Sequence, residues 1–220
     1  GEADKTILMY NHYDVQPPEP IEKWKYPPFG SEIHDGHLYV RGCADDKGTL
    51  LSRVQAIGAI LKTGHKLPVN VKFLVEGEEE IGSPSFEKFV HKHKDLLKAD
   101  ACLWENSAKD EDDNPVVKLG NKGMLYCELH VKTGNTDVHS MNAPVVPSAA
   151  WELVEALKSL RDETGKVLID GFYDDVLPVC AEEEEAWKKV PSPEKGLKKR
   201  LGIDKFVNDA TGDKVNIALY

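Results

Sequence analysis

The sequence lacks the features of membrane, secreted and nucleic-acid-binding proteins. No apolar run in it reaches 18 residues, so no transmembrane helix and no membrane partner are predicted. Its first residues, GEADKTILMY, contain no basic segment followed by a long apolar stretch, which argues against a secretory signal. The formal net charge is −10, whereas nucleic-acid-binding surfaces are rich in lysine and arginine. We therefore expect an acidic surface and no nucleic-acid partner.

Cysteine is also scarce. The four cysteines lie far apart and form no CxxC pair: Cys43, Cys102, Cys127 and Cys180. This spacing argues against a disulfide-rich scaffold and against a structural zinc finger. We interpret the cysteines as reduced thiols, which predicts a cytoplasmic location. Internal repeats and long low-complexity segments are absent as well, so a repeat architecture is not expected.

Short apolar runs alternate with helical patterns in the first half of the sequence. Strands are predicted at 6–10, 36–40, 70–75 and 101–104, and helices at 49–61 and 83–97. The helix at 49–61 has apolar residues at helical spacing and is expected to stop near Gly64. The order of these elements favours an α/β fold, in which helices flank a mainly parallel sheet.

The second half of the sequence has a different character. A polar turn at 110–114 precedes a predicted β-pair of residues 116–119 and 124–131. The later elements are predicted as helices at 149–160 and 181–189, a linker-like stretch at 191–199 and a strand that begins at 216. These shifts place a domain boundary near 115–123 and divide the chain into residues 1–118 and 119–220.

Ionisable side chains follow the predicted strands of the first half. They are His12 and Asp14 after the first strand, Glu78, Glu79 and Glu80 after the third and Glu105 after the fourth, with Asp45 and Asp46 in the turn that opens the helix from Thr49. In an open α/β sheet, ligands bind beyond the carboxyl ends of the strands. Carboxylates that converge there repel one another unless a cation lies among them. Imidazole and carboxylate together suit zinc, manganese or cobalt.

Three segments carry a resemblance to a known family. They are HYDVQPPEPIEKWKYPPFGSEIHDGHLYVRGCADDKG, EGEEEIGS and GNTDVHS. Each motif alone is weakly specific, but together they resemble the co-catalytic zinc hydrolases. That family includes carnosinases, bacterial dipeptidases, glutamate carboxypeptidases, aminoacylases and acetylornithine or succinyl-diaminopimelate deacylases. The WKYPPF insert and the DDKG turn look closest to the dipeptidase branch. Val40 and Met141 stand where the family commonly has glycine.

The resemblance implies a zinc-exopeptidase-like catalytic domain in residues 1–118. It also implies that residues 119–220 form part of an α+β, ferredoxin-like lid, through which such proteins form homodimers. Two zinc ions are implied, with Mn²⁺ or Co²⁺ as alternatives. His12 and Glu105 would bind the first ion, Glu80 the second, and Asp45 would bridge both. Asp14 would orient the imidazole of His12.

The resemblance also implies catalytic roles. Glu79 would be the general base, and His139 would stabilise the oxyanion of the tetrahedral intermediate from the lid. The Asp45–Asp46 peptide would be cis. The register of the glutamate triplet follows from Ile81-Gly82-Ser83, although a slip by one residue to Glu78 and Glu79 stays open.

The extent of the chain departs from the family pattern. Members of the family are longer at both ends, and a later segment supplies the histidine of the second zinc. No segment of this sequence fills that role, so we expect a fragment that binds one metal ion better than two.

The function that the motifs indicate is zinc-dependent hydrolysis of a peptide bond, in a dipeptide or at the C-terminal residue of a small peptide. An amino-acid N-deacylase uses the same metal chemistry, so the motifs do not separate these two enzymes. A non-catalytic metal-binding or dimerisation module is a third interpretation, favoured only by the short chain.

Overall fold

The computed structural model describes residues 3–106, 108–110, 113–118 and 120–219. Their contacts divide the chain into two units. Unit 1 comprises residues 1–109 and 114–117, and unit 2 comprises residues 110–113 and 118–220. The identification of unit 1 as a catalytic domain and of unit 2 as a lid stays a prediction.

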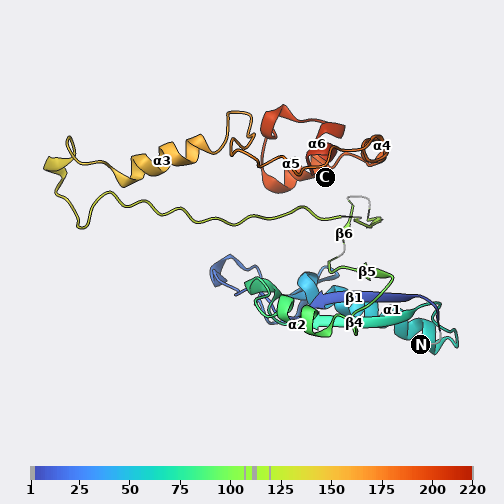
Figure 1. Cartoon of the computed structure of the whole chain (residues 1–220). Coiled ribbons are helices and arrows are strands. Elements are labelled where there is room, and N and C mark those ends of the chain that lie inside the picture. The colour runs from blue at the N-terminus through green and yellow to red at the C-terminus, as the bar shows by residue number, and fades with distance from the viewer. Residues whose placement is uncertain (1–2, 107, 111–112, 119, 220) are drawn as a thin grey trace. The chain divides into compact units, whose positions relative to one another are not determined.

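A three-stranded parallel sheet forms the centre of unit 1. Its strands are β1 (Thr6–His12), β4 (Asn70–Glu76) and β5 (Ala101–Leu103), in the order β4-β1-β5 (Figure 1). All pairings are parallel, so the predicted fold class is confirmed for this unit. Because the carboxyl ends of parallel strands meet at one edge, His12 and the segments that follow β4 and β5 share that edge.

Two helices accompany this sheet, as predicted. Helix α1 (Gly48–Lys62) agrees closely with the pattern, and its residues Leu50, Arg53 and Ile57 are less exposed than most of the helix. Helix α2 (Phe86–His93) is shorter than the predicted 83–97. It begins later because Ser83 has a left-handed φ of 52° and Pro84 follows it.

The segment between β1 and α1 contains a small antiparallel hairpin. Strands β2 (Glu32–His34) and β3 (His37–Tyr39) form it, and the ring of Tyr26 stacks on His34 at 3.5 Å between centroids. The remaining short elements of unit 1 are the 3₁₀ helices Ile21–Lys23 and Glu79–Ile81, the π-helical turn Cys43–Lys47 and the paired strands β6 (Ala108–Lys109) and β7 (Pro115–Val116).

Among the described residues, unit 2 contains helices and one isolated antiparallel bridge, between Arg161 and Val167. Its α-helices are α3 (Ala149–Ser159), α4 (Ala181–Lys189), α5 (Glu194–Leu201) and α6 (Asp213–Leu219), and its 3₁₀ helices are Ser140–Asn142 and Val207–Asp209. Helices α3 and α4 confirm the predictions for 149–160 and 181–189.

Three predictions for secondary structure are wrong. The strand predicted at 124–131 is not formed, and Figure 1 shows this stretch as extended chain. A strand needs a partner for its backbone, and within the intended partner Val116 pairs in the strand β7 with β6 instead, while residues 117 and 118 form no strand. Leu119 lies outside the described residues. The stretch at 191–199 is largely the helix α5 rather than a linker.

The third correction concerns the predicted strand from residue 216, which is part of the helix α6. Asn216 is buried, and its Nδ2 donates to the carbonyl oxygens of Trp187 (3.2 Å) and Val190 (2.7 Å). The side chain therefore binds carbonyl groups at the C-terminal end of α4, a contact between distant segments that local patterning does not reveal. Tyr220 lies outside the described residues.

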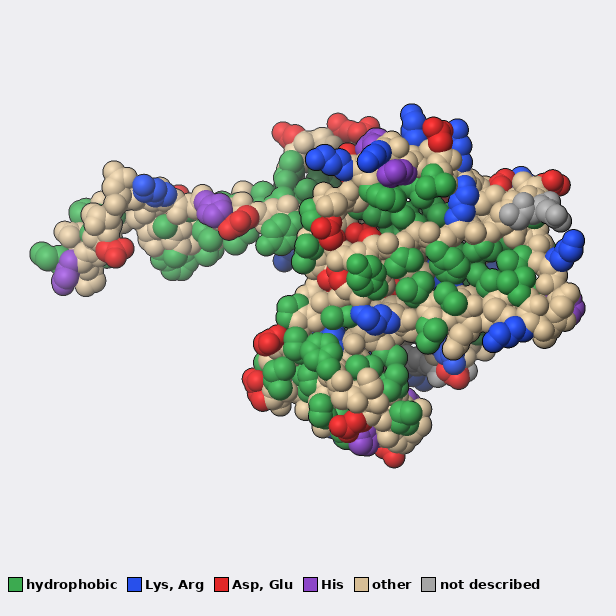
Figure 2. All heavy atoms as spheres, turned by 90° about the horizontal axis from the view of Figure 1, so that it is seen from below, with side chains coloured by type: hydrophobic (Ala, Val, Ile, Leu, Met, Phe, Trp, Pro, Cys, Tyr) green, Lys and Arg blue, Asp and Glu red, His purple; other side chains and the backbone are tan. Residues whose placement is uncertain are grey.

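The buried core of unit 1 follows β1. Leu8 and Tyr10 are its buried hydrophobic residues among those described, and Tyr10 stacks on Trp104 at 4.0 Å between centroids. Many other hydrophobic side chains stay exposed, and Figure 2 shows them across the face in view. Asn11 and His12, which follow Tyr10 in the strand, are polar and even more deeply buried, so the carboxyl end of β1 has a polar core.

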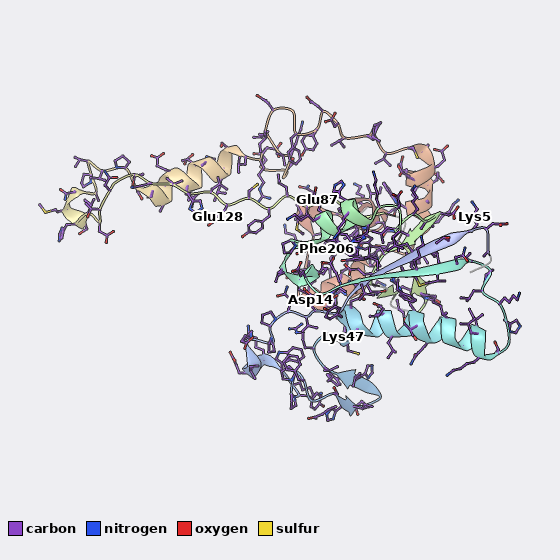
Figure 3. All side chains as sticks on the ribbon, turned by 60° about the horizontal axis from the view of Figure 1, so that its bottom comes forward. Lys5, Asp14, Lys47, Glu87, Glu128 and Phe206 are labelled. Carbon is purple, nitrogen blue, oxygen red and sulfur yellow. The ribbon has the colours of Figure 1, made fainter. Side chains whose placement is uncertain are left out.

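The two ends of β1 are held by ionic and polar contacts. Lys5 Nζ lies 2.7 Å from Asp100 Oδ1, and the backbone N–H of Thr6 donates to the same carboxylate at 2.8 Å. At the other end, Lys47 donates to the carbonyl oxygen of Tyr13. Figure 3 shows Lys5 at one end of the strand, and Asp14 and Lys47 near its other end, where α1 begins.

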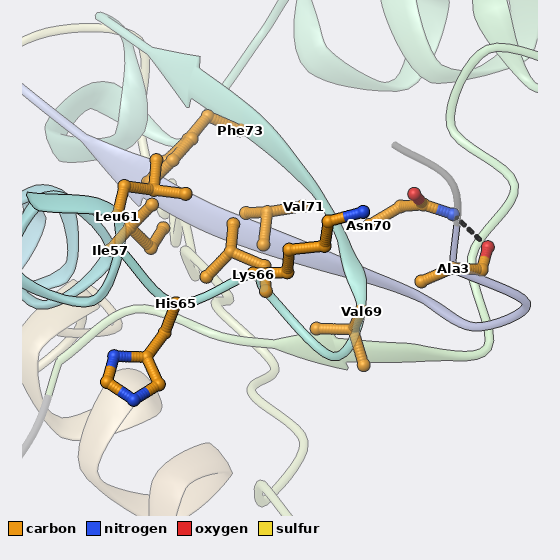
Figure 4. Close-up of a pocket in the computed structure, with 10 residues that line it drawn as sticks. Ala3, Ile57, Leu61, His65, Lys66, Val69, Asn70, Val71 and Phe73 are labelled. Carbon is orange, nitrogen blue, oxygen red and sulfur yellow. Dashed lines mark hydrogen bonds between the residues drawn. The ribbon is translucent and has the colours of Figure 1, made fainter. Parts of the chain in front are cut away.

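An apolar groove of about 750 Å³ lies between α1 and β4 (Figure 4). Its lining includes Ile57, Leu61, Val71 and Phe73. Asn70, at the start of β4, donates to the carbonyl oxygen of Ala3 at 2.6 Å on its rim. The groove lies toward the beginning of β4, whereas the acidic residues follow the end of that strand, so it is not part of the acidic cluster.

Two further observations bear on the predictions of location. The four cysteines are free thiols, as expected for a reducing compartment, but the cytoplasmic location itself stays a prediction. Among the described residues, no helix combines the length and the hydrophobicity needed to cross a membrane.

Gly42 generates a prediction about stability. Its φ is +83°, and a Cβ at this position would lie 2.4 Å from Val15 Cγ1. We expect Gly42→Ala to lower the free energy of unfolding by about 2 to 4 kcal/mol, because left-handed backbone and steric overlap both add a cost. Urea unfolding measures it. Gly36→Ala is the matched control, since Gly36 has φ +78° and no atom within 4 Å of its Cβ position. Equal losses in both variants would contradict the role of Val15.

Candidate metal centre

His12 lies at the centre of a group of carboxylates. It is the last residue of β1, and its side chain is only 1% exposed. Nε2 lies 2.9 Å from Asp45 Oδ1, 3.7 Å from Glu105 Oε2 and 4.0 Å from Glu79 Oε2. On the other side of the ring, Nδ1 lies 3.2 Å from Asp14 Oδ1. Carboxylates thus face both ring nitrogens, an arrangement that a protonated imidazole or a cation beside Nε2 satisfies electrostatically.

Asp45 and Asp46 enter the cluster from the turn before α1. The peptide bond between them is cis, as the resemblance implies. The side chain of Asp45 is 59% exposed, whereas Asp46 is buried. Asp46 Oδ2 accepts hydrogen bonds from Asn11 Nδ2 (2.6 Å) and from the backbone N–H of His12 (3.3 Å). The two neighbouring carboxylates therefore differ, one reaching His12 from the open side and the other anchored beneath it.

The glutamates after β4 point in different directions. The N–H of Glu80 donates to Asp14 Oδ2 at 2.9 Å, and Gln16 Nε2 donates to both the carbonyl oxygen and Oε2 of Glu80, each at 2.9 Å. Glu78 instead accepts from the N–H of Ser85 at 3.1 Å, at the start of α2. Glu79 and Glu80, rather than Glu78, thus lie on the side of His12 and Asp14, which is the geometry that the chosen register requires.

Burial shifts the pKa of several members of the cluster. The side chain of Glu105 is 11% exposed, and burial raises its pKa to about 7, with Glu79, Asp46 and Asp45 acting in the same direction against His12. Burial also raises the pKa of Glu79. Burial alone would lower the pKa of His12, but the hydrogen bond to Asp45 and the charge of Glu105 outweigh it and raise that pKa. Without a cation, the cluster therefore retains protons.

The pKa of Asp14 moves in the opposite direction. Burial would raise it, but hydrogen bonds from backbone N–H groups, led by that of Glu80, and the contact with His12 hold it below its usual range. An ionised Asp14 favours a proton on Nδ1 of His12, so that the lone pair of Nε2 is available to a cation on the side of Asp45 and Glu105.

The donor set fits a divalent cation. Candidate ligand atoms lie within 4.8 Å of one another in two groups, His12–Asp46–Glu105 and His12–Asp45–Glu80. Asp46 Oδ1 and Glu105 Oε2 are buried, and neither has a hydrogen-bond partner among the residues that the structure describes. Two such carboxylate oxygens beside an imidazole are stabilised by a cation with oxygen and nitrogen ligands.

His139 lies outside this cluster, in unit 2. It precedes the 3₁₀ helix Ser140–Asn142, and its Nδ1 accepts a hydrogen bond from the N–H of Met141 at 3.2 Å. The structure thus brings together His12, Asp14, Asp45, Glu79, Glu80 and Glu105 in unit 1. The role of His139 and the individual roles of the clustered residues stay predictions.

Four residues that form hydrogen bonds to the segments of the cluster had no predicted role: Asn11, Gln16, Asp46 and Arg53. For Asp46, adjacency to Asp45 in a turn was a usable signal. The position of Arg53 was also a usable signal, since it lies three residues after Leu50 and four before Ile57, on the same face of α1. The sequence contains no such signal for Asn11 and Gln16, because polar residues near the end of a strand usually face solvent.

Comparisons with known proteins show the family to which the chain is related. A family model described as Peptidase family M20/M25/M40 matches residues 8–176. Beta-Ala-His dipeptidase of Homo sapiens is 32% identical over 207 residues, which cover 93% of this chain and 41% of that protein. Cys-Gly metallodipeptidase DUG1 of Saccharomyces cerevisiae is 31% identical over 220 residues, with coverages of 98% and 44%. The family and the dipeptidase branch expected from the motifs are thereby confirmed.

A solved structure is more similar still. The crystal structure of an M20 family metallo-carboxypeptidase, Sso-CP2 from Sulfolobus solfataricus, superposes with a TM-score of 0.92 at 44% identity. It covers 99% of this chain, which in turn covers 49% of that protein. The chain therefore spans about half the length of the relatives that it matches, or less.

The raised pKa of Glu105 generates a prediction for the metal-free protein. The folded state keeps a proton up to about pH 7 that the unfolded state releases near 4.5. The stability that this proton confers is therefore present below pH 4.5 and is lost as the pH rises through about 7. The raised pKa of His12 acts in the same direction. We expect the chelator-treated protein to lose stability between pH 5.5 and 7.5, and Glu105→Gln to lose less, as measured by urea unfolding.

The control for this experiment is Glu87→Gln, which removes an exposed carboxylate from α2. It should show the same pH dependence as the unsubstituted protein. If Glu105→Gln lost as much stability as Glu87→Gln over this interval, the proton assigned to Glu105 would lie elsewhere.

Proposed function

Because the chain belongs to the peptidase family M20/M25/M40, we propose that its protein hydrolyses a peptide bond, in a dipeptide or at the C-terminal residue of a small peptide. One observation carries the proposal. A buried imidazole and several carboxylates, two of them with buried oxygens that lack hydrogen-bond partners in the described part of the chain, converge at the carboxyl edge of a parallel sheet.

We assign the metal ligands as follows. His12, Asp45 and Glu105 would hold the first cation, and Asp45 and Glu80 would hold the second. The spacing of His12 Nε2 from Asp45 (2.9 Å) and from Glu105 (3.7 Å) supports the first set. Zinc is the proposed metal, since a mixture of imidazole and carboxylate suits it, and Mn²⁺ and Co²⁺ are alternatives.

The residues of the chain divide the chemical work. A bound divalent cation supplies a Lewis acid for the scissile carbonyl. Glu79 takes a proton from the attacking water and returns it to the leaving amine. Burial raises the pKa of Glu79, which brings it closer to the value at which a general base also acts as an acid near neutral pH. Asp14 holds the imidazole of His12 by Nδ1 and so fixes the direction of Nε2.

Glu79→Gln tests the function directly. In the full-length protein, we expect the rate of hydrolysis to fall by about 10²- to 10⁴-fold while metal content is unchanged. The reason is that the substitution removes the proton acceptor and no assigned ligand. The assay is amino-acid release from a panel of dipeptides, longer peptides and N-acyl amino acids. Glu78→Gln is the matched control, since Glu78 contacts Ser85 on the side of α2.

The substrate panel separates the competing functions. Preferential release of acetate or succinate would show that the protein is an N-deacylase rather than a peptidase. A protein that binds the metal but hydrolyses no member of the panel, whether or not Glu79 is substituted, would be a binding module, and the proposal would be wrong.

The lid assignment of unit 2 belongs to the same proposal. We place His139 as an electrophilic residue that stabilises the oxyanion, acting across a homodimer formed through unit 2. His139→Ala is expected to lower kcat by about 10²- to 10³-fold, as removal of one oxyanion donor does elsewhere. The control is His130→Ala in the same unit, where the exposed imidazole lies 3.2 Å from Glu128. Equal activities of the two variants would rule out the role, and sedimentation velocity tests the dimer.

A further inference from the structure

A single arginine joins the segments that carry the cluster. Arg53, on α1, donates from Nη1 to the carbonyl oxygen of Tyr10 (2.6 Å) and to Asn11 Oδ1 (2.7 Å). The same guanidinium donates to the carbonyl oxygens of Leu103 (3.4 Å) and Trp104. One planar group therefore contacts the backbone immediately before His12 and the backbone immediately before Glu105.

Asn11 extends these contacts to the turn before α1. Its side chain is fully buried, and Nδ2 donates to Asp46 Oδ2 (2.6 Å) and to Thr49 Oγ1 (3.2 Å). Thr49 Oγ1 in turn donates to the carbonyl oxygen of Asp46 at 2.9 Å. Hydrogen bonds thus run continuously from the half-buried Arg53 through the buried Asn11 to the buried Asp46.

This network determines which way Asp46 faces. Oδ2 is occupied by Asn11 and by the N–H of His12, so Oδ1 is left on the side of His12 and Glu105. The positive charge of Arg53 also lies behind a group of carboxylates that would otherwise repel one another. No part of the proposed chemistry uses Arg53 or Asn11, which contact none of the assigned reacting groups.

We propose that Arg53 and Asn11 are positioning residues for the cation site, which hold Asp46 and the backbones of His12 and Glu105 at the spacing that a divalent cation requires. This inference rests on the proposed function, since it presupposes that the cluster binds a metal. It does not concern the chemistry of hydrolysis, so metal binding tests it independently of activity.

The alternative is a structural role alone, in which Arg53 stabilises the packing of α1 on the sheet. The two roles differ in one measurable respect. A structural residue changes the free energy of unfolding and leaves the affinity of the folded protein for the metal as it was. Removing a positioning residue instead weakens metal binding, by about 10- to 100-fold for groups that support the ligands.

Co²⁺ is the probe, because its visible absorption reports both affinity and coordination geometry. The full-length protein is treated with a chelator and then titrated with Co²⁺. The variants Arg53→Met, Arg53→Lys and Asn11→Asp are titrated in the same way. We expect Arg53→Met and Asn11→Asp to weaken Co²⁺ binding about 10- to 100-fold and to alter the absorption envelope. Asn11→Asp keeps the shape of the side chain but sets a carboxylate against Asp46. Arg53→Lys keeps the charge without the planar fork and should recover part of the affinity.

Lys62→Met is the matched control, since it removes one positive charge from the last turn of the same helix. Circular dichroism and urea unfolding verify that each variant is folded. If Arg53→Met does not fold, Asn11→Asp and Arg53→Lys still decide the question. Affinities within about twofold of that of Lys62→Met in the folded variants would overturn the inference.

The two proposals fail in distinguishable ways. Unsubstituted protein that binds Co²⁺ but hydrolyses no substrate overturns the proposed function alone. Unsubstituted protein that binds Co²⁺ with an affinity unaffected by Asn11→Asp and Arg53→Lys overturns the positioning role alone. Protein that binds no Co²⁺ overturns both.

Discussion

The approach of several carboxylates to one imidazole is the constraint on which unit 1 depends. Asp45, Glu105 and Glu79 lie 2.9, 3.7 and 4.0 Å from Nε2 of His12, and like charges at such spacing repel one another unless protons or cations neutralise them. Without such neutralisation the cluster is a local source of instability. Its geometry exists because parallel pairing of β1 with β4 and β5, and hydrogen bonds to backbone groups, fix the segments that carry the acids.

The contacts beneath the cluster form two layers with different tasks. Asp14 and Gln16 hold the side chain of His12 and the side chain and backbone of Glu80. Arg53 and Asn11 lie deeper and act on the backbone of β1 and on the turn before α1. Hydrogen bonds among buried polar groups favour one arrangement of the segments that they join, which explains how a protein with few buried hydrophobic residues among those described can still define a site.

Much of unit 1 could be predicted because its signals are local. The strands β1 and β4 contain short apolar stretches, α1 has helical spacing, and the ligand motifs lie where each strand ends. Unit 2 was harder, since α6 depends on the hydrogen bonds of Asn216 with carbonyl groups of α4, and the strand at 124–131 lacks a partner in the described part of the chain. Within the site, Arg53 escaped notice because an arginine on a helix is usually solvated, and only the fold shows which carbonyl groups surround it.

The central place of β1 also governs when the site can exist as the chain is synthesised. β1 leaves the ribosome before its partners Asn70–Glu76 and Ala101–Leu103, and the β2–β3 hairpin and α1 are synthesised in between. Pairing between distant segments comes late, because the entropy of the intervening chain must be lost before the contact is gained. The imidazole of His12 therefore lacks its full set of carboxylate neighbours until Glu105 has been synthesised. A cation site at this edge can therefore be complete only after Glu105 has been synthesised and the three strands have paired.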